Sequence, residues 1–276
     1  MISALILTLN EELNLPACLD SIRWCDDILV VDSFSSDKTS EIAKSRGAVV
    51  VQRRFDCFAN QRNFGLENHD FRYDWILHLD ADERVSDELH AEMTSEIRKG
   101  EKKAYRVASK IMFYGKWLKH SGMYPAYQVR LGRKDFLRFV QTGHGQREDG
   151  ASDEIGTLRS PFIHYCFSKG LTDWFEKHNR YSRDESLWAT RAVENSIDWA
   201  GIFSIRDAVC RRRALKALSF RLPFRPTLRF LYMYLFRLGF LDGWQGLTYC
   251  RLLSIYEYMT FLKIKEIEFI SKGPNI

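Results

Sequence analysis

The chain of 276 residues lacks several features by which whole classes of protein are recognised. Its longest stretches without Asp, Glu, Lys or Arg are ten residues, at positions 1–10 and 120–129. A helix that crosses a bilayer needs about 20 apolar residues, so we expect no standard transmembrane segment. Residues 1–10 also lack the basic, apolar and small-residue order of a leader peptide, and a secretory signal is therefore not expected.

Cysteine pairs and repeats are missing as well. No two of the six cysteines form a Cys-x-x-Cys pattern; they are Cys18, Cys25, Cys57, Cys166, Cys210 and Cys250. This scatter is typical of reduced cytosolic thiols and argues against a zinc site or a disulfide framework. There is no internal repeat or low-complexity tract. With 45% hydrophobic and 28% charged residues, the chain has the composition of a globular protein.

The positive charge is concentrated in one part of the chain. The formal net charge is +5, but residues 206–265 contain 12 Lys and Arg against 3 Asp and Glu, a net of +9, so that the remainder carries −4. This asymmetry predicts chemistry in the front part and attachment to an anionic partner behind it.

Strand and helix patterns alternate over the first hundred residues. Short apolar runs of buried-strand length are separated by helical patterns; we expect strands at 2–8, 27–32, 48–52 and 75–79, and helices at 11–24, 36–46, 58–67 and 86–99. Further strands are expected at 104–113 and 127–131, and helices from residue 171 onward. The pattern predicts an α/β fold, a mainly parallel sheet with helices on both faces, followed by a helical, aromatic and basic extension. We place the catalytic domain at 1–165 and the helical region at 166–276.

Polar residues follow three of the expected strands, at the edge where parallel sheets bind ligands. They are Thr8 to Glu12, Asp32 to Thr39, and His78 to Glu83. Each group alone is consistent with a helix cap. Three such groups on one edge favour a binding site, and Asp80 and Asp82 have the chemistry to hold Mg²⁺ or Mn²⁺ beside substrate phosphates.

Other polar residues are candidates for the same cleft. Asp32 has acceptors for a base or ribose, and Ser35 has a backbone N–H near a helix start, although it could simply be a cap. Gln61 and Arg62 lie on the short helix expected at 58–67. Arg62 has the charge and geometry for a phosphate, with a solvated surface arginine as the alternative.

Four segments in this order and spacing resemble a family 2 glycosyltransferase of the GT-A fold. They are LTLNEE at 7–12, VVDSFSSDKT at 30–39, QRNFGL at 61–66 and WILHLDADE at 75–83. The resemblance implies a nucleotide-sugar donor and a divalent cation. It implies nucleotide contacts at Thr8, Asn10 and Glu11, base binding at Asp32, ribose, diphosphate or metal contacts at Asp80 and the adjoining Ala81, and a metal ligand at Asp82.

The general base is expected in the second half of the domain. An acceptor hydroxyl cannot attack unaided, so a carboxylate must remove its proton. The candidates lie in residues 143–149, where we rank Glu148 first and Asp149 second, with His144 as a helper or metal-side contact. A charged surface loop is the alternative, since relatives of this kind carry a compact His-Glu pair and here Glu148 lies four residues after His144.

The C-terminal part resembles the bacterial lipopolysaccharide core β-1,4-glucosyltransferases in residues 169–182, Arg225-Pro226 and 239–243. Residues 221–237 and 244–263 interleave arginines with aromatic and aliphatic residues. Such a segment is suited to an anionic bilayer interface; a helix pair packed on the catalytic domain is the alternative. No nucleic-acid module is recognisable, so we expect no nucleic-acid partner.

These patterns together predict a cytoplasmic enzyme, peripheral on the inner face of the cytoplasmic membrane. It is expected to move a hexose, with glucose favoured, from a UDP-type donor to a hydroxyl of a lipopolysaccharide-core or other lipid-linked glycan, with inversion. A nucleotidyltransferase is the enzyme alternative, but the acidic Asn10-Glu11-Glu12 replaces the Gly-rich basic loop that grips a triphosphate. A catalytically inactive glycan- or membrane-binding protein is the other.

Overall fold

The structure, a computed structural model, describes residues 1–142, 145–149, 152–194, 196–203, 208–222 and 224–271. The chain forms two compact units, Met1–Gly170 and Leu171–Ile276. The division falls five residues after the position at which the sequence placed it.

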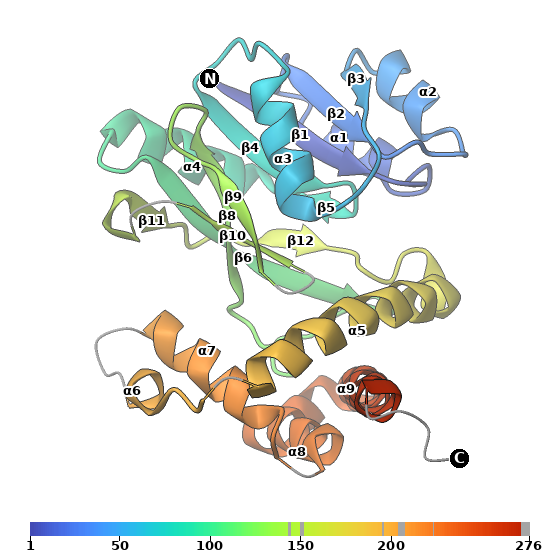
Figure 1. Ribbon diagram of the computed structural model, residues 1–276. Coiled ribbons are helices and arrows are strands. Elements are labelled where there is room, and N and C mark those ends of the chain that lie inside the picture. Colours follow the sequence, from blue (N-terminus) through green and yellow to red (C-terminus); the bar gives the residue numbers. More distant parts are fainter. Residues whose placement is uncertain (143–144, 150–151, 195, 204–207, 223, 272–276) are drawn as a thin grey trace. The chain divides into compact units, whose positions relative to one another are not determined.

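The first unit is built on a mixed β-sheet (Figure 1). Its strand order is β3-β2-β1-β4-β8-β6-β12-β5, from the strands β1 (Ile2–Thr8), β2 (Ile28–Asp32), β3 (Val49–Gln52), β4 (Trp75–Asp80), β5 (Glu83–Arg84), β6 (Ala104–Phe113), β8 (Tyr127–Arg133) and β12 (Phe162–His164). The first four in this order are parallel, whereas β8 is antiparallel to both its neighbours. Three small additions complete the unit: β7 (Lys116–Trp117) and β11 (Ile155–Thr157), which pair with β6, and a hairpin of β9 (Phe139–Thr142) and β10 (Gly145–Glu148), followed by the 3₁₀ turn η1 (Ser152–Glu154).

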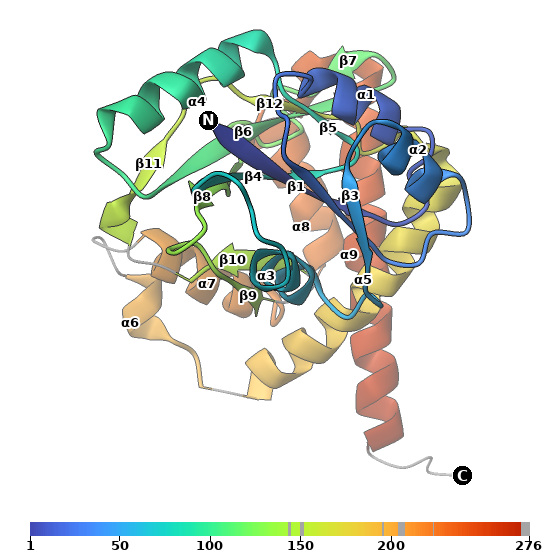
Figure 2. The same cartoon turned by 90° about the horizontal axis from the view of Figure 1, so that it is seen from above.

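Helices cover both faces of this sheet (Figure 2). Helices α1 (Leu15–Ser21), α2 (Thr39–Ser45) and α4 (Asp87–Lys99) lie on one face, and α3 (Phe58–Glu67) lies on the other. Successive residues of a strand point to opposite faces, so Ile6 packs with the first group of helices and Leu5 packs with α3. The uninterrupted burial of β1 and β4 follows from this two-sided cover.

Two helices start later than the sequence predicts. The patterns indicate helices from residues 11 and 36, but α1 starts at Leu15 and α2 at Thr39. The backbone N–H of Glu11 donates to Thr39 Oγ1, and that of Glu12 donates to Asp37 Oδ2. Because these bonds join the loops after β1 and β2 to each other, the residues concerned do not continue the helices.

The second unit is helical. It contains α5 (Gly170–Glu194, whose first residue closes the first unit), α6 (Trp199–Ile202), α7 (Ala208–Ser219), α8 (Arg225–Leu231), the π-helical turn η2 (Tyr232–Phe236), the 3₁₀ turn η3 (Gly239–Asp242) and α9 (Gly243–Ser271). Helix α8 and the turns η2 and η3 pack along α9. None of the helices in the described residues has the length and apolar character that crossing a membrane requires.

Ion pairs and hydrogen bonds join the helices of this unit. Lys216 Nζ lies 2.6 Å from the buried carboxylate of Glu185, which connects α7 to α5. Lys263 Nζ donates to the side chain of Ser182 at 2.7 Å, which connects α9 to α5. Arg225 Nε lies 2.9 Å from Glu257, which connects α8 to α9. The helices are therefore held by polar contacts as well as by apolar packing.

Candidate active site

The parallel strands align their polar carboxyl ends. In the register of β1 with β2, Thr8 lies opposite Asp32, and in the register of β1 with β4, Leu7 lies opposite Asp80. The ends of three strands therefore reach the same edge of the sheet, as the sequence predicts.

Asp32 is fully buried and organises the loop that follows β2. Thr8 Oγ1 donates to Asp32 Oδ1 at 2.9 Å, and the backbone N–H of Ser35 donates to Asp32 Oδ2 at 3.0 Å. Its other donors are the side chains of Ser35, Ser40 and Gln52. The oxygens of Asp32 are thus bound by protein donors, and the residue shapes this edge from beneath.

The loops after β1 and β2 are joined side by side. The backbone N–H of Asn10 donates to Ser35 Oγ at 2.8 Å, and Asn10 Oδ1 accepts from the backbone N–H of Ser36 at 2.8 Å. Asn10 has a φ of 55° and Phe34 a φ of 62°, both in the left-handed region, which Asn enters more readily than Phe. Phe34 is 53% exposed and follows Asp32, the last residue of β2, by two positions.

Gln61 faces the interior. Its side chain is buried, with Nε2 donating to Ser33 Oγ at 2.8 Å and Oε1 accepting from Arg53 Nη1 at 2.7 Å. These bonds attach α3 to the loop after β2. The sequence proposed Gln61 as a donor contact, and the structure places its polar atoms on protein partners.

A buried group of charges surrounds Asp80. Arg62 Nη2 donates to Asp80 Oδ1 at 2.7 Å and Arg130 Nη2 donates to Asp80 Oδ2 at 2.8 Å; Arg130 also donates to Glu83. Arg62, Arg130 and Glu83 are all at most 3% exposed. Arg62 is therefore not a solvated surface arginine, and the described residues offer no hydrogen-bond partner to its buried Nε and Nη1.

The two carboxylates of this charge cluster have opposite pKa shifts. Burial would raise the pKa of Asp80, but Arg130 and Arg62 outweigh it and hold that pKa well below its usual range. Burial is the dominant cause for Glu83, whose pKa is raised although Arg130 opposes the shift. Asp80 is therefore the anion that balances the two guanidinium groups.

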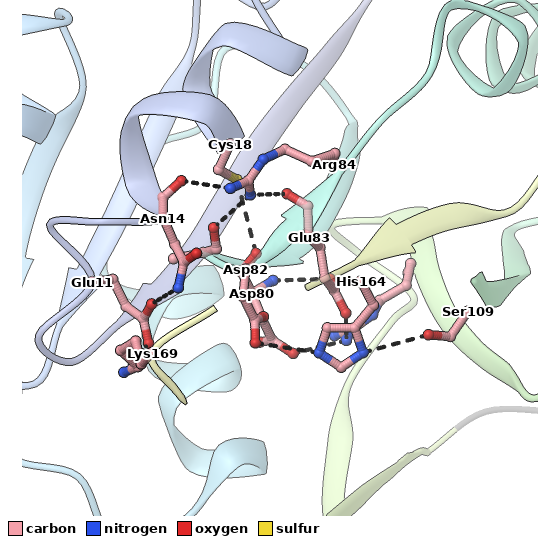
Figure 3. Close-up of polar contacts among 12 residues, drawn as sticks. Glu11, Asn14, Cys18, Asp80, Asp82, Glu83, Arg84, Ser109, His164 and Lys169 are labelled. Carbon is pink, nitrogen blue, oxygen red and sulfur yellow. Dashed lines mark hydrogen bonds and ion pairs between the residues drawn. The ribbon is translucent and has the colours of Figure 1, made fainter. Parts of the chain in front are cut away.

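Asp82 points to His164 (Figure 3). His164 Nε2 lies 3.3 Å from Asp82 Oδ2, and His164 Nδ1 lies 3.4 Å from Ser109 Oγ. Burial alone would lower the pKa of His164, but the carboxylate of Asp82 outweighs it and the pKa is raised. Asp82 and His164 therefore place a carboxylate oxygen and an imidazole nitrogen side by side at the end of β4.

Sequence reasoning did not single out His164. It lies 82 residues after Asp82, and the pairing of β12 with β5, in which His164 lies opposite Glu83, brings the two together. The only local signal is a histidine at the end of the short apolar run Phe162-Ile163, which many core strands share.

Arg84 fixes the turn that carries Asp82. Its Nη1 donates to the carbonyl oxygens of Ala81 and Glu83, each at 2.8 Å, and its Nη2 donates to that of Asn14 at 2.9 Å. Ala81 itself is buried. The described residues contain no group of three or more His, Cys, Asp or Glu arranged to hold a metal ion.

Glu11 lies on the other side of this turn (Figure 3). Its carboxylate lies 2.7 Å from Lys169 Nζ and accepts from Asn14 Nδ2 at 2.7 Å. Burial raises the pKa of Glu11, and the charge of Asp82 raises it further. Burial and the charge of Asp82 therefore both oppose ionisation of Glu11, while Asn14 and Lys169 favour it.

The hairpin of β9 and β10 carries the proposed base residues. Glu148 is half-buried on β10 and lies opposite Phe139, whose ring lies 5.8 Å from the Arg62 guanidinium. Asp149 is exposed, and its backbone N–H donates to the carbonyl oxygen of Arg138 at 2.8 Å. His144 lies outside the described residues.

Comparison with known protein families identifies the class of enzyme. The model of glycosyl transferase family 2 matches residues 3–154, which is more than half of the chain and includes the ends of β1, β2 and β4.

The chain belongs to glycosyl transferase family 2.

Similar proteins carry the same family name. The uncharacterised glycosyltransferase RT0209 of Rickettsia typhi is 25% identical over 99% of this chain and 89% of its own length. The lipopolysaccharide core biosynthesis glycosyltransferase LpsC of Rhizobium meliloti is 27% identical over 100% and 96%. Among solved structures, residues 1–349 of S. aureus TarS align over 99% of this chain and 91% of that one, with 14% identity and a TM-score of 0.44.

Membership of this family confirms two of the predictions. The glycosyltransferase has the α/β sheet with helices on both faces and the helical C-terminal region that the GT-A resemblance implied. The enzyme class is also confirmed, which sets aside the nucleotidyltransferase. The sheet is more mixed than predicted, because β8 runs antiparallel between β4 and β6.

Proposed function

We propose that this glycosyltransferase moves a hexose, with glucose favoured, from a UDP-type donor to a hydroxyl of a lipopolysaccharide-core or other lipid-linked glycan, with inversion. The observation that carries the proposal is the pairing of Asp82 with His164 at the carboxyl end of β4, beside the joined loops that follow β1 and β2. This pairing supplies metal donors where a parallel sheet binds nucleotides.

The chemistry of the pair fits a divalent cation. One carboxylate oxygen and one imidazole nitrogen lie 3.3 Å apart, and both side chains are partly accessible. Carboxylates suit Mg²⁺ and Mn²⁺, and the imidazole favours Mn²⁺ of the two. Held by these two residues, the ion would neutralise the charge that develops on the departing diphosphate.

We assign Asp80 a positioning role beside this pair. Both of its oxygens already accept hydrogen bonds from buried arginines. Its carboxylate thus fixes the end of β4, from which Asp82 extends. This assignment differs from the expectation that Asp80 and Asp82 bind the metal together.

The donor nucleotide would lie on the joined loops. Asn10, Glu11 and Ser35 belong to these loops. The exposed Phe34 offers an aromatic ring on which a base can stack. Asp32 and Thr8 lie buried beneath and would act by holding the loop in shape. Gln61 and Arg62 would act in the same indirect way.

The acceptor hydroxyl needs a base, for which we retain Glu148 first and Asp149 second. Glu148 lies opposite Phe139, whose ring lies 5.8 Å from the guanidinium of Arg62. A carboxylate on this hairpin would take the proton of the hydroxyl as the new bond to the sugar forms. One base and one departing diphosphate suffice for a single displacement, which inverts the anomeric centre.

The proposed acceptor is lipid-linked, and the enzyme is proposed to be cytoplasmic and peripheral on the membrane. The name of the relative LpsC, a lipopolysaccharide core biosynthesis glycosyltransferase, supports the acceptor class. Residues 221–244 support membrane attachment, since they combine four arginines with one acidic residue, the buried Asp242. Bulky apolar side chains are exposed along them: Leu222, Phe224, Leu228, Leu231, Tyr232, Leu235, Phe236, Leu238, Phe240, Leu241 and Trp244.

Metal binding and sugar transfer test the proposal together. Purified enzyme is titrated with Mn²⁺ and followed by electron paramagnetic resonance, and it is assayed with a panel of nucleotide sugars and a lipid-linked glycan. Asp82→Asn and His164→Ala should each weaken Mn²⁺ binding and, because several kcal/mol of charge stabilisation are lost, slow transfer by about a hundredfold or more.

The control is Asp26→Asn, which alters an exposed carboxylate paired with Arg72. It should leave both readouts unchanged. Transfer at the wild-type rate by Asp82→Asn in Mn²⁺ buffer would overturn the metal assignment, and no transfer from any donor would overturn the proposed reaction.

A further inference from the structure

Lys169 lies at the end of the β1 strand although it is far away in the sequence. Its Nζ lies 2.7 Å from Glu11 Oε1 and donates to the carbonyl oxygen of Asn10 at 3.3 Å (Figure 3). The side chain of Lys169 is 24% exposed and that of Glu11 is 14% exposed. The ammonium group is therefore held at the sheet edge and remains within reach of solvent.

The segment that carries Lys169 starts at His164, which pairs with Asp82. His164 contacts Asp82, and the backbone N–H of the next residue, Tyr165, donates to the carbonyl oxygen of Asp82 at 2.9 Å. Five residues after His164, Lys169 reaches the loop after β1. Residues 164–169 thus connect the proposed metal site to the proposed nucleotide loop.

We infer that Lys169 binds the diphosphate group of the donor, and that it exchanges Glu11 for phosphate oxygens when the donor binds. The inference rests on the proposed function, since it concerns the same donor. An ammonium group on a flexible stem binds phosphate as a point charge and can move between nearby acceptors. A diphosphate carries more negative charge than the single carboxylate of Glu11, and it would lie between the Asp82–His164 pair and the nucleotide loop.

Glu11 has the opposite role in this scheme. Its carboxylate lies beside the Lys169 ammonium group, and it would repel a diphosphate that binds there. Its contact with Lys169 keeps the ammonium group in place while the site holds no donor. Glu11 therefore competes with the diphosphate for Lys169, and the two residues should affect donor affinity in opposite directions.

Isothermal titration of the full-length enzyme tests this inference. UDP, GDP, CDP and ADP are each titrated in Mn²⁺ buffer, and the diphosphate that binds is compared with its monophosphate. Loss of a hydrogen bond to a charged group predicts that Lys169→Met weakens diphosphate binding by about tenfold or more. The monophosphate, which lacks the terminal phosphate, should be affected less.

Two further variants separate the exchange from a simple structural contact. Lys169→Arg should keep most of the affinity. Glu11→Gln should tighten diphosphate binding by about two- to fivefold, the range that a partly exposed ion pair corresponds to. If Lys169 and Glu11 merely fasten the segment to the sheet, Glu11→Gln and Lys169→Met will weaken binding alike.

Lys134→Met is the matched control. Lys134 Nζ also donates to a carbonyl oxygen, that of Phe71 at 2.9 Å, and lies near a carboxylate, that of Asp74 at 3.8 Å. This variant should bind the diphosphate like the wild type. Wild-type affinity in Lys169→Met overturns the inference alone, whereas a wild-type enzyme that binds none of the four diphosphates overturns the proposed function as well.

Discussion

Among single residues, the two aspartates of the Asp-x-Asp segment differ in their surroundings. Asp80 accepts hydrogen bonds from two buried arginines and its side chain is 29% exposed, whereas Asp82 contacts a histidine and its side chain is 14% exposed. The same residue type, two positions apart, is therefore suited to two tasks. Asp80 stabilises the end of the strand, and Asp82 is the residue that we propose as the metal ligand.

This difference predicts that Asp80 matters for stability. Asp80→Asn removes the anion that both Arg62 and Arg130 contact, and breaking a buried ion pair on one side costs about 3–5 kcal/mol. The free energy of unfolding, measured by urea titration of the full chain, should fall by an amount of this order.

Asp135→Asn provides the comparison for Asp80→Asn. Asp135 also pairs with an arginine, Arg133, at 3.0 Å, but its side chain is 63% exposed. An exposed ion pair contributes about 0.2–1 kcal/mol to stability, so the free energy of unfolding of this variant should remain close to that of the wild type. Equal losses in the two variants would contradict the role assigned to Asp80.

The sequence identified some residues of the candidate site and missed others for a physical reason. Asp80, Asp82 and Asp32 follow apolar strands directly, so a local pattern marks them. His164 and Lys169 belong to the site only through strand pairing and chain reversal over more than 80 residues, which no local pattern encodes. The burial of Gln61 and Arg62 also depends on distant partners, Ser33 and Asp80.

Among helices and strands, the bounds of several elements agree with the sequence prediction. Strand β1 and helix α3 have the predicted bounds, and β4 differs by one residue. The larger errors lie at both ends of α1, which spans Leu15–Ser21 where 11–24 was expected, and at the start of α2. At the two starts, hydrogen bonds from Glu11 and Glu12 to the other loop replace helical ones. Contacts between loops of distant sequence override local preference there.

A second element-level feature is the close approach of η3 to α9. A Cβ atom on Gly246 would lie 2.2 Å from the carbonyl oxygen of Gly239 and 2.7 Å from Asp242 Cβ. Alanine is better than glycine within a helix by about 1 kcal/mol. The carbonyl oxygen of Gly239 is a backbone atom that cannot move aside alone. The destabilisation from the clash should therefore exceed the gain in helix propensity.

Gly246→Ala is therefore predicted to lower the stability of the enzyme, by about 1–3 kcal/mol as expected for overpacking. Thermal unfolding followed by circular dichroism measures it. Gln245→Ala, one residue earlier on α9, adds the same helix former without the clash and should leave the midpoint unchanged or raise it. A rise in the midpoint of Gly246→Ala would show that η3 does not press on the helix.

Across the whole molecule, net positive charge and exposed apolar side chains are concentrated in the C-terminal unit. Phe224 is 78% exposed and Phe236 is 79% exposed. Phe224 also has a φ of 57° and Leu238 a φ of 60°, conformations that are costly for bulky residues. Strained backbone at exposed apolar residues points to a function for them.

Membrane attachment is the function we expect of these residues. Phe224→Ser combined with Phe236→Ser should reduce flotation with vesicles that contain phosphatidylglycerol by about tenfold or more, because burying each ring contributes about 1.5–3 kcal/mol. Raising the salt concentration should reduce flotation of the wild type, because salt screens the interaction of the arginines with the anionic headgroups.

Phe203→Ser serves as the control for flotation. Phe203 is 74% exposed and follows α6, outside residues 221–244. It should float like the wild type. If the double variant floats as well as the wild type, or if the wild type remains in the soluble fraction, the apolar face has another partner, and a change in oligomeric state on light scattering would identify a second copy of the chain.

The bridge between β12 and β5 has one more consequence. Only two residue pairs, Ile163 with Arg84 and His164 with Glu83, form it, and side chains alternate between the faces of a strand. An insertion or deletion of a single residue next to either strand would shift the register and turn the histidine to the opposite face, away from Asp82. Chain length at this point is thus as restricted as residue identity, and length changes compatible with activity belong elsewhere in the chain.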